Sequence, residues 1–138
     1  MKTRPSPSRT QAIRSPRGET AGNAFPLSRV CCVNNPDPRF DAEVHVVRLG
    51  DVAICTNPFE LYTDYGIRIK ARSKAVQTFV VELTGGPGDG SPYLPTEAAV
   101  RGGGYSAIAP SCNVGPEGGQ ILVERTVEAI NAMWEKSN

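Results

Sequence analysis

Apolar and polar positions mark three strands in the second part of the chain. The segment 43–49 is β-branched and apolar, and the almost wholly apolar segment 52–56 follows it after Gly50-Asp51. This arrangement predicts a hairpin whose two-residue turn uses the glycine for a positive φ. The segment 77–83 predicts another strand. Because 52–56 is continuously apolar, we expect it to be buried on both faces of a sheet.

A helix is predicted between the last two of these strands. Asn57, Pro58 and Glu60 suit an N-cap, the first helical residue and a third residue that closes a capping box. We expect this helix to end near Arg72. The order strand, helix, strand predicts a parallel βαβ unit with a right-handed crossover. The inner stripe of the helix comprises Leu61, Tyr65 and Ile69.

Two further helices are predicted after a glycine-rich loop at residues 84–92. A short helix begins at Pro95 or Thr96 and ends at Gly102, and a last helix begins at 115–117, where proline again suits the first turn. The predicted fold class is therefore α/β, a βαβ-containing parallel or mixed sheet with flanking helices that forms part of a domain. The apolar stripe of the last helix comprises Val123, Val127, Ile130 and Trp134.

Residues 1–30 differ from the rest of the chain in charge. They hold six basic residues and one acidic residue, whereas residues 31–138 hold nine basic and thirteen acidic residues. The segment 1–30 is proline-rich and has no apolar periodicity, so we expect it to be a disordered tail before an α/β unit at 31–138. A secretory signal is excluded because an apolar stretch of about 7–15 residues is missing. A transit peptide, an RNA-binding tail and a non-native start of a truncated reading frame are alternatives, so the compartment is not predicted.

Composition excludes several classes of function. The formal net charge is +1, so the chain as a whole is not a polyelectrolyte partner of nucleic acid. No apolar run of about 18 residues is present, which excludes a transmembrane helix. The four cysteines form no CxxC pair and the single histidine is His45, so a finger-type zinc site is not expected. We interpret His45 and Cys55 as structural residues of their strands.

The predicted topology brings chemically useful residues to one edge of the sheet. Ligands of open parallel sheets bind at the carboxyl ends of the strands. Glu60 follows one strand, and the glycine-rich loop and Tyr93 follow the next. Each residue also has a structural interpretation: Glu60 as a helix-capping carboxylate, and Tyr93 and Tyr105 as half-buried aromatic residues. The glycines do not form a phosphate-binding P-loop, because no Gly-Lys-Ser/Thr follows them.

Four motifs carry a resemblance to a known family. They are RLGDVAICTNPFELYTDYGIRIKARS, TFVVELTGG, YLPTEAAVRGGGYSA and GPEGGQILVERTVEAI, in this order. With them, residues 44–134 resemble the C-terminal part of the catalytic domain of neutral/alkaline non-lysosomal ceramidase-like proteins, and most of all the shorter bacterial ceramidase-like hydrolases. The resemblance implies a zinc-dependent amidase of sphingolipid metabolism, which hydrolyses the amide bond of N-acyl sphingosine.

The resemblance also implies roles for three residues. Glu60 and Tyr93 match a glutamate and a tyrosine that hold zinc together with two histidines from the earlier half of the domain. Tyr105 matches a second tyrosine, twelve residues after the first, that helps to stabilise the oxyanion. The histidine-bearing half and the immunoglobulin-like domain of true ceramidases have no counterpart in this sequence, and His45 matches neither histidine. The glycines before Tyr105 depart from the family pattern, which leaves the specificity for ceramide open.

The sequence thus predicts a fragment of a zinc-dependent amidohydrolase that acts on a small-molecule or lipid amide. We expect it to be inactive alone and to bind zinc weakly, because two oxygen ligands make a weak site. The alternative is a non-catalytic α/β binding or interaction module whose glycine-rich edge holds a small anion.

Two structural expectations accompany this interpretation. The missing half of the domain would normally supply sheet neighbours and cover for the parallel strands. Without it, the strand at 52–56 should leave a face or an edge of the sheet exposed, which predicts self-association or binding of a hydrophobic dye. The carboxylate of Glu60 and the hydroxyl of Tyr93 should lie about 3–4 Å apart, with Tyr105 in the same cleft. A separation of more than about 10 Å, or a position on opposite faces, would contradict the zinc site.

Overall fold

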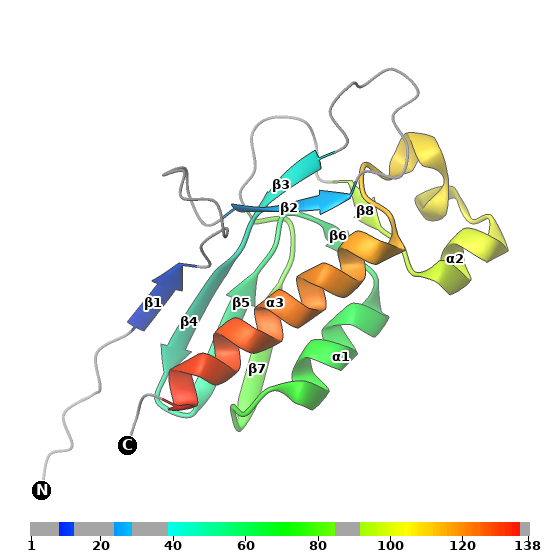
Figure 1. Ribbon diagram of the computed structural model, residues 1–138. Coiled ribbons are helices and arrows are strands. Elements are labelled where there is room, and N and C mark those ends of the chain that lie inside the picture. The colour runs from blue at the N-terminus through cyan, green and yellow to red at the C-terminus, as the bar shows by residue number, and fades with distance from the viewer. Residues whose placement is uncertain (1–8, 13–23, 29–38, 85–91, 136–138) are drawn as a thin grey trace, which may run out of the picture.

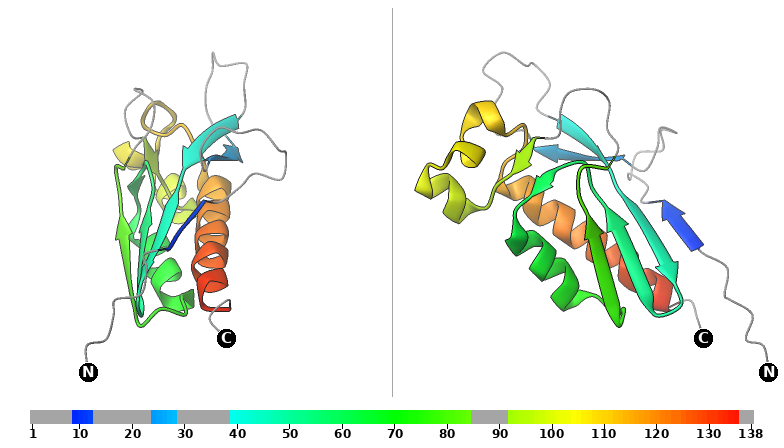
Figure 2. Two further views of the ribbon diagram at one scale, coloured as in Figure 1. Left: turned by 90° about the vertical axis from the view of Figure 1, so that its left-hand side faces the viewer. Right: turned by 180° about the vertical axis from the view of Figure 1, so that it is seen from behind.

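The computed structural model describes residues 9–12, 24–28, 39–84 and 92–135. Helices α1 and α3 lie on the same side of a small mixed sheet (Figures 1 and 2), so the predicted α/β class is confirmed. None of the described helices is both long and apolar enough to cross a bilayer. The elements are β1 Arg9–Ala12, β2 Ala24–Ser28, β3 Arg39–Glu43, β4 His45–Leu49, β5 Val52–Thr56, β6 Glu60–Leu61, α1 Thr63–Arg72, β7 Gln77–Val81, β8 Tyr93–Leu94, α2 Glu97–Gly102, the 3₁₀ turns η1 Tyr105–Ala107 and η2 Ala109–Ser111, and α3 Pro116–Glu135.

The main sheet has the strand order β1-β4-β5-β7. Strands β4 and β5 form the predicted hairpin, in which Leu49 pairs with Val52 and Gly50 has a φ of 61°. Strands β5 and β7 are parallel and are connected by α1, which confirms the βαβ unit. The carboxyl ends of β5 and β7 therefore lie at the same edge of the sheet, where the candidate site was predicted.

Two segments of the N-terminal region are strands. Strand β1 pairs antiparallel with β4, and β2 pairs antiparallel with β3. No strand was predicted within residues 1–30, because these two segments find partners far along the chain that a local pattern does not show. The expectation of a disordered tail stays a prediction. The other residues of 1–30, together with Cys31 and Cys32, lie outside the described residues.

The first helix begins later than predicted. Helix α1 starts at Thr63, and the side chain of Asn57 caps no helix but accepts a hydrogen bond from the Phe59 amide at 3.1 Å. The Glu60 amide donates to the Pro92 carbonyl at 3.2 Å, and Glu60–Leu61 pair with β8 as a parallel strand. The capping-box prediction for Glu60 is therefore wrong, because pairing with β8 supplies long-range hydrogen bonds instead.

The later helices follow their predicted boundaries closely. The Thr96 hydroxyl accepts a hydrogen bond from the Ala99 amide at 3.3 Å and caps α2, and Gly103 ends that helix with a φ of 68°. Helix α3 starts at Pro116, as the sequence predicted. Of the glycine-rich loop, residues 85–91 lie outside the described part of the chain.

The core lies between the sheet and helices α1 and α3. Both predicted apolar stripes point into it, and only Trp134 of their residues is not fully buried. The guanidinium of Arg48 stacks on the Trp134 ring at 4.1 Å from its centroid and closes one end of the core. The core cluster includes Val44, Val46, Ala53, Cys55, Phe59, Leu61, Tyr65, Ile69, Leu94, Leu122, Val123, Val127, Ile130 and Met133.

The opposite face of the main sheet is partly exposed. In β5 only Ala53 and Cys55 are buried, so the expectation that this strand is buried on both faces is wrong. In the neighbouring β7, Phe79 is 51% exposed and Val81 is 40% exposed. Figure 2 shows the reason: α1 and α3 both lie on the other side of the sheet. An apolar face, defined here as Val52, Ile54, Phe79 and Val81, is thus not covered by a helix in the described part of the chain: Phe79 and Val81 are exposed, and Val52 and Ile54 are half-buried.

Candidate functional site

Glu60 and Tyr93 are brought together by a short parallel strand pair beyond the carboxyl ends of β5 and β7. Strands β6 and β8 place Glu60 opposite Tyr93 and Leu61 opposite Leu94. The two leucines are buried in the core, at 8% and 0% exposure. Because side chains alternate along a strand, Glu60 and Tyr93 point away from the core on the same face. The carboxylate of Glu82 accepts a hydrogen bond from the Leu61 amide at 2.9 Å and holds β6 in place.

Tyr105 joins this pair from a later turn. Gly103 ends α2 in the left-handed conformation, so the chain reverses and enters the 3₁₀ turn η1 at Tyr105. The hydroxyls of Tyr105 and Tyr93 lie 2.9 Å apart, and their rings meet edge to face with centroids 5.4 Å apart. Tyr105 is 69% exposed, so its position depends on polar contacts more than on packing.

The three side chains form one network: the Tyr93 hydroxyl lies 2.9 Å from that of Tyr105, and Glu60 lies opposite Tyr93 on the paired strand. The contact with Tyr105, and next the neighbouring Glu60, raise the pKa of Tyr93 above the ordinary tyrosine value. Both groups therefore favour the neutral phenol over the phenolate. The structure thus brings Tyr93 and Tyr105 into contact and places Glu60 opposite Tyr93, and the helix-cap interpretation of Glu60 is wrong. The expected separation of about 3–4 Å between the Glu60 carboxylate and the Tyr93 hydroxyl stays a prediction.

The donor set fits part of a zinc site. A carboxylate and a phenol oxygen on neighbouring strands are acceptable zinc ligands, but zinc sites in proteins have four ligands and normally include histidine or cysteine. The ring of His45 is hydrogen-bonded to Glu43 at 2.8 Å and is not among the groups that act on Tyr93. Within residues 39–84 and 92–135, no three His, Cys, Asp or Glu side chains gather closely enough to hold a metal ion. Glu60 and Tyr93 could therefore be two of the ligands only.

A hydroxyl pair beside the network was not predicted from the sequence. The Tyr62 hydroxyl lies 2.6 Å from the Ser106 Oγ, which links the end of β6 to the turn that carries Tyr105. The two residues are 44 positions apart; each lies within one of the four motifs, but no spacing or periodicity in the sequence points to their contact.

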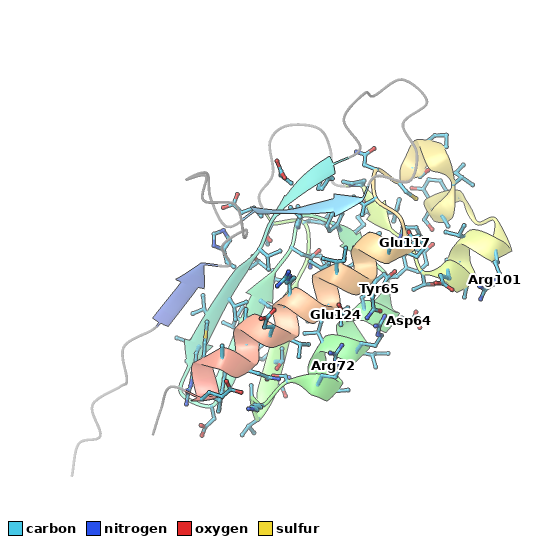
Figure 3. The ribbon with its side chains drawn as sticks, viewed as in Figure 1. Asp64, Tyr65, Arg72, Arg101, Glu117 and Glu124 are labelled. Carbon is cyan, nitrogen blue, oxygen red and sulfur yellow. The ribbon has the colours of Figure 1, made fainter. Side chains whose placement is uncertain are left out.

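Apart from this site, a cavity of about 570 Å³ lies between the N-terminal parts of α1, α2 and α3. Asp64, Glu97 and Glu117 line it, each in the first turn of one helix. Figure 3 labels Asp64 of α1 and Glu117 of α3. Acidic residues in a first turn stabilise the helix through its dipole. Glu97 also pairs with Arg101 at 3.5 Å on the exposed surface. The acidic lining of this cavity is thus explained by helix stability, and it is not the candidate site.

No protein-family model matches this chain, and no curated protein or solved structure gives a significant match. The assignment of a function therefore depends on the four sequence motifs and on the arrangement of Glu60, Tyr93 and Tyr105. The motifs select the three residues by their position in the sequence, whereas the fold determines how close they lie in space.

Proposed function

We propose that this chain carries part of the active site of a zinc-dependent amidohydrolase. Glu60 and Tyr93 would be two ligands of the zinc ion, and Tyr105 would donate a hydrogen bond to the oxyanion. The observation that supports this most is the placement of the three side chains beyond the carboxyl ends of the parallel strands, with Glu60 opposite Tyr93 and the hydroxyls of Tyr93 and Tyr105 2.9 Å apart. The histidine ligands that the resemblance implies would come from another polypeptide segment, so the chain alone is inactive.

The residues present have distinct tasks in such a site. Zinc, when bound, supplies a Lewis acid that polarises the amide carbonyl and activates water. Tyr93 would hold the ion through its phenol oxygen, in place of its 2.9 Å contact with the Tyr105 hydroxyl, which favours the neutral phenol. The hydroxyl of Tyr105 would exchange its contact with Tyr93 for a substrate oxygen, and loss of one such donor costs about 3–4 kcal/mol of transition-state stabilisation. The substrate would be a small-molecule or lipid amide.

Zinc titration of the full chain tests this proposal without requiring turnover. Deprotonation of Tyr93 on zinc produces the near-ultraviolet absorption of a phenolate, which is followed at constant pH. We expect a signal that needs excess zinc, because two oxygen ligands bind weakly. Tyr93→Phe should abolish the signal and Glu60→Gln should weaken it, whereas Tyr105→Phe should keep it. Magnesium, which prefers octahedral sites with several bound waters, serves as the control for ionic strength.

Two outcomes would contradict the proposal. One is no phenolate signal in the unaltered chain at excess zinc, and the other is an equal signal in Tyr93→Phe. The alternative of an anion-binding module depends on the glycine-rich edge. Residues 85–91 of that edge lie outside the described residues, so no observation on the described part of the chain favours this alternative.

A further inference from the structure

We propose that Tyr62 and Ser106 are positioning residues that hold the turn η1 against strand β6 and thereby keep Tyr105 within reach of Tyr93. The role in catalysis rests on the proposed function, whereas the positioning itself does not. Neither residue is assigned as a metal ligand, so their effect on the site would be transmitted through Tyr105.

Tyr62 is held firmly in place by its neighbours. It directly follows Leu61 of β6 and precedes α1, and its carbonyl accepts a hydrogen bond from the Tyr65 amide at 3.0 Å. The ring of Tyr62 packs against the core cluster. Its hydroxyl is therefore a fixed point beside the strand that carries Glu60.

The turn η1 has fewer fixed points. It follows three glycines, and the Gly104 carbonyl accepts its closing hydrogen bond from the Ala107 amide at 2.8 Å. The Ser106 carbonyl accepts a bond from the Cys112 thiol at 3.3 Å, and a thiol is a weak donor. Ala107 is buried, but Tyr105 is 69% exposed. The 2.6 Å contact between Ser106 and Tyr62 is thus the link that ties this turn to β6.

Together these contacts form a closed ring. Strand β6 pairs with β8, Tyr93 of β8 bonds Tyr105 at 2.9 Å, and the neighbouring Ser106 bonds Tyr62 at the end of β6. If the Ser106 link is removed, the exposed bond between the two phenols must hold the turn in competition with water. We therefore expect Tyr105 to leave Tyr93 for a large fraction of the time.

The test follows the NMR resonances of the tyrosine rings. The chain has four tyrosines, so a sample labelled with ¹³C at the ring Cζ gives four resonances that Phe variants assign. In Ser106→Ala, the Cζ resonances of Tyr93 and Tyr105 should both shift. Ser106→Thr keeps the hydroxyl and should restore the original resonances.

A matched control removes a similar contact elsewhere. Ser73 accepts a hydrogen bond from the Thr78 hydroxyl at 2.7 Å, far along the chain from the network. Ser73→Ala should leave the Tyr93 and Tyr105 resonances unchanged. If Ser106→Ala also leaves them unchanged, or if Ser106→Thr fails to restore them in a folded protein, the positioning role is wrong.

The positioning role of Ser106 and the proposed zinc site can be tested separately. The zinc-dependent phenolate signal of Tyr93 should persist in Ser106→Ala, because Glu60 and Tyr93 remain paired on β6 and β8. A chain that shows the Ser106 effect but no zinc signal would support the positioning contact and contradict the proposed metal site.

Discussion

The close approach of α1 and α3 at Gly119 gives the sharpest prediction for stability. A Cβ on Gly119 would overlap Cζ and Oη of the Tyr65 ring and would lie 2.7 Å from its Cε1. Tyr65 is only 2% exposed, and its hydroxyl donates to the Pro95 carbonyl at 2.8 Å. The ring cannot move aside without losing this bond, so Gly119→Ala must separate the helices or displace the ring.

The expected magnitude follows from three contributions. Alanine is favoured over glycine within a helix by about 0.5–1 kcal/mol. Overpacking of a well-packed core costs about 1–3 kcal/mol, and leaving the buried Pro95 carbonyl unpaired costs about 1–3 kcal/mol. The two costs less the helix preference of alanine give an expected loss of about 1–5 kcal/mol in the free energy of unfolding for Gly119→Ala.

Urea denaturation followed by circular dichroism measures this change as a lower midpoint at similar slope. Gly66→Ala is the matched control: Gly66 lies within α1, and a Cβ added to it would meet nothing within 4 Å, so alanine there should stabilise by about 0.5–1 kcal/mol. In a Tyr65→Ala background, Gly119→Ala should lose most of its effect. Equal stabilisation by Gly119→Ala and Gly66→Ala would refute the steric reasoning.

Three other predictions follow from the fold. Phe79→Lys on the apolar face should reduce binding of a hydrophobic dye and any self-association seen by sedimentation, whereas Ile67→Lys, at an apolar residue 60% exposed on α1, should not. Burial raises the pKa of Cys55 from 9.0 to about 12, so as the pH rises the thiol loses its proton in the unfolded chain before it does so in the folded one. The free energy of unfolding should therefore fall as the pH rises from 9.0 to about 12. Cys55→Ala should reduce that slope in thermal melts at stepped pH, and an unchanged slope would contradict the burial argument. Leu83 is 57% exposed at a φ of 55°, so Leu83→Asn should raise the melting temperature slightly, and a clear fall would argue against strain.

Elements with a strong local period were predictable from the sequence. The hairpin at Gly50 and the stripe of α3 depend on alternation and helical spacing, which neighbouring residues set. The start of α1 was not predictable in this way, because Asn57 and Glu60 resemble a helix cap locally but are held by residues from β7 and β8. Strands β1 and β2 were missed for the same reason, since their partners lie far along the chain.

The candidate site was predicted in part. The rule that ligands bind at the carboxyl ends of parallel strands, together with the motifs, selected Glu60, Tyr93 and Tyr105, and the fold brings them together. The contact of Tyr62 with Ser106 was not predictable, because a single long-range hydrogen bond leaves no periodic or compositional signal. Exposure of the apolar face depended on which side of the sheet the helices occupy, and the apolar run of β5 does not encode that side.

The pairing of β6 with β8 has a consequence for the order of folding. The hairpin of β4 and β5 closes a two-residue turn, but the pairing of Glu60 with Tyr93 must wait until α1 and β7 have closed the intervening loop. Contacts between distant parts of a chain form late, because the entropy of loop closure opposes them until other contacts are made. The tyrosine pair therefore acquires its native environment after the helices have formed. During refolding, the spectroscopic signal of the tyrosines should change later than the far-ultraviolet signal of the helices.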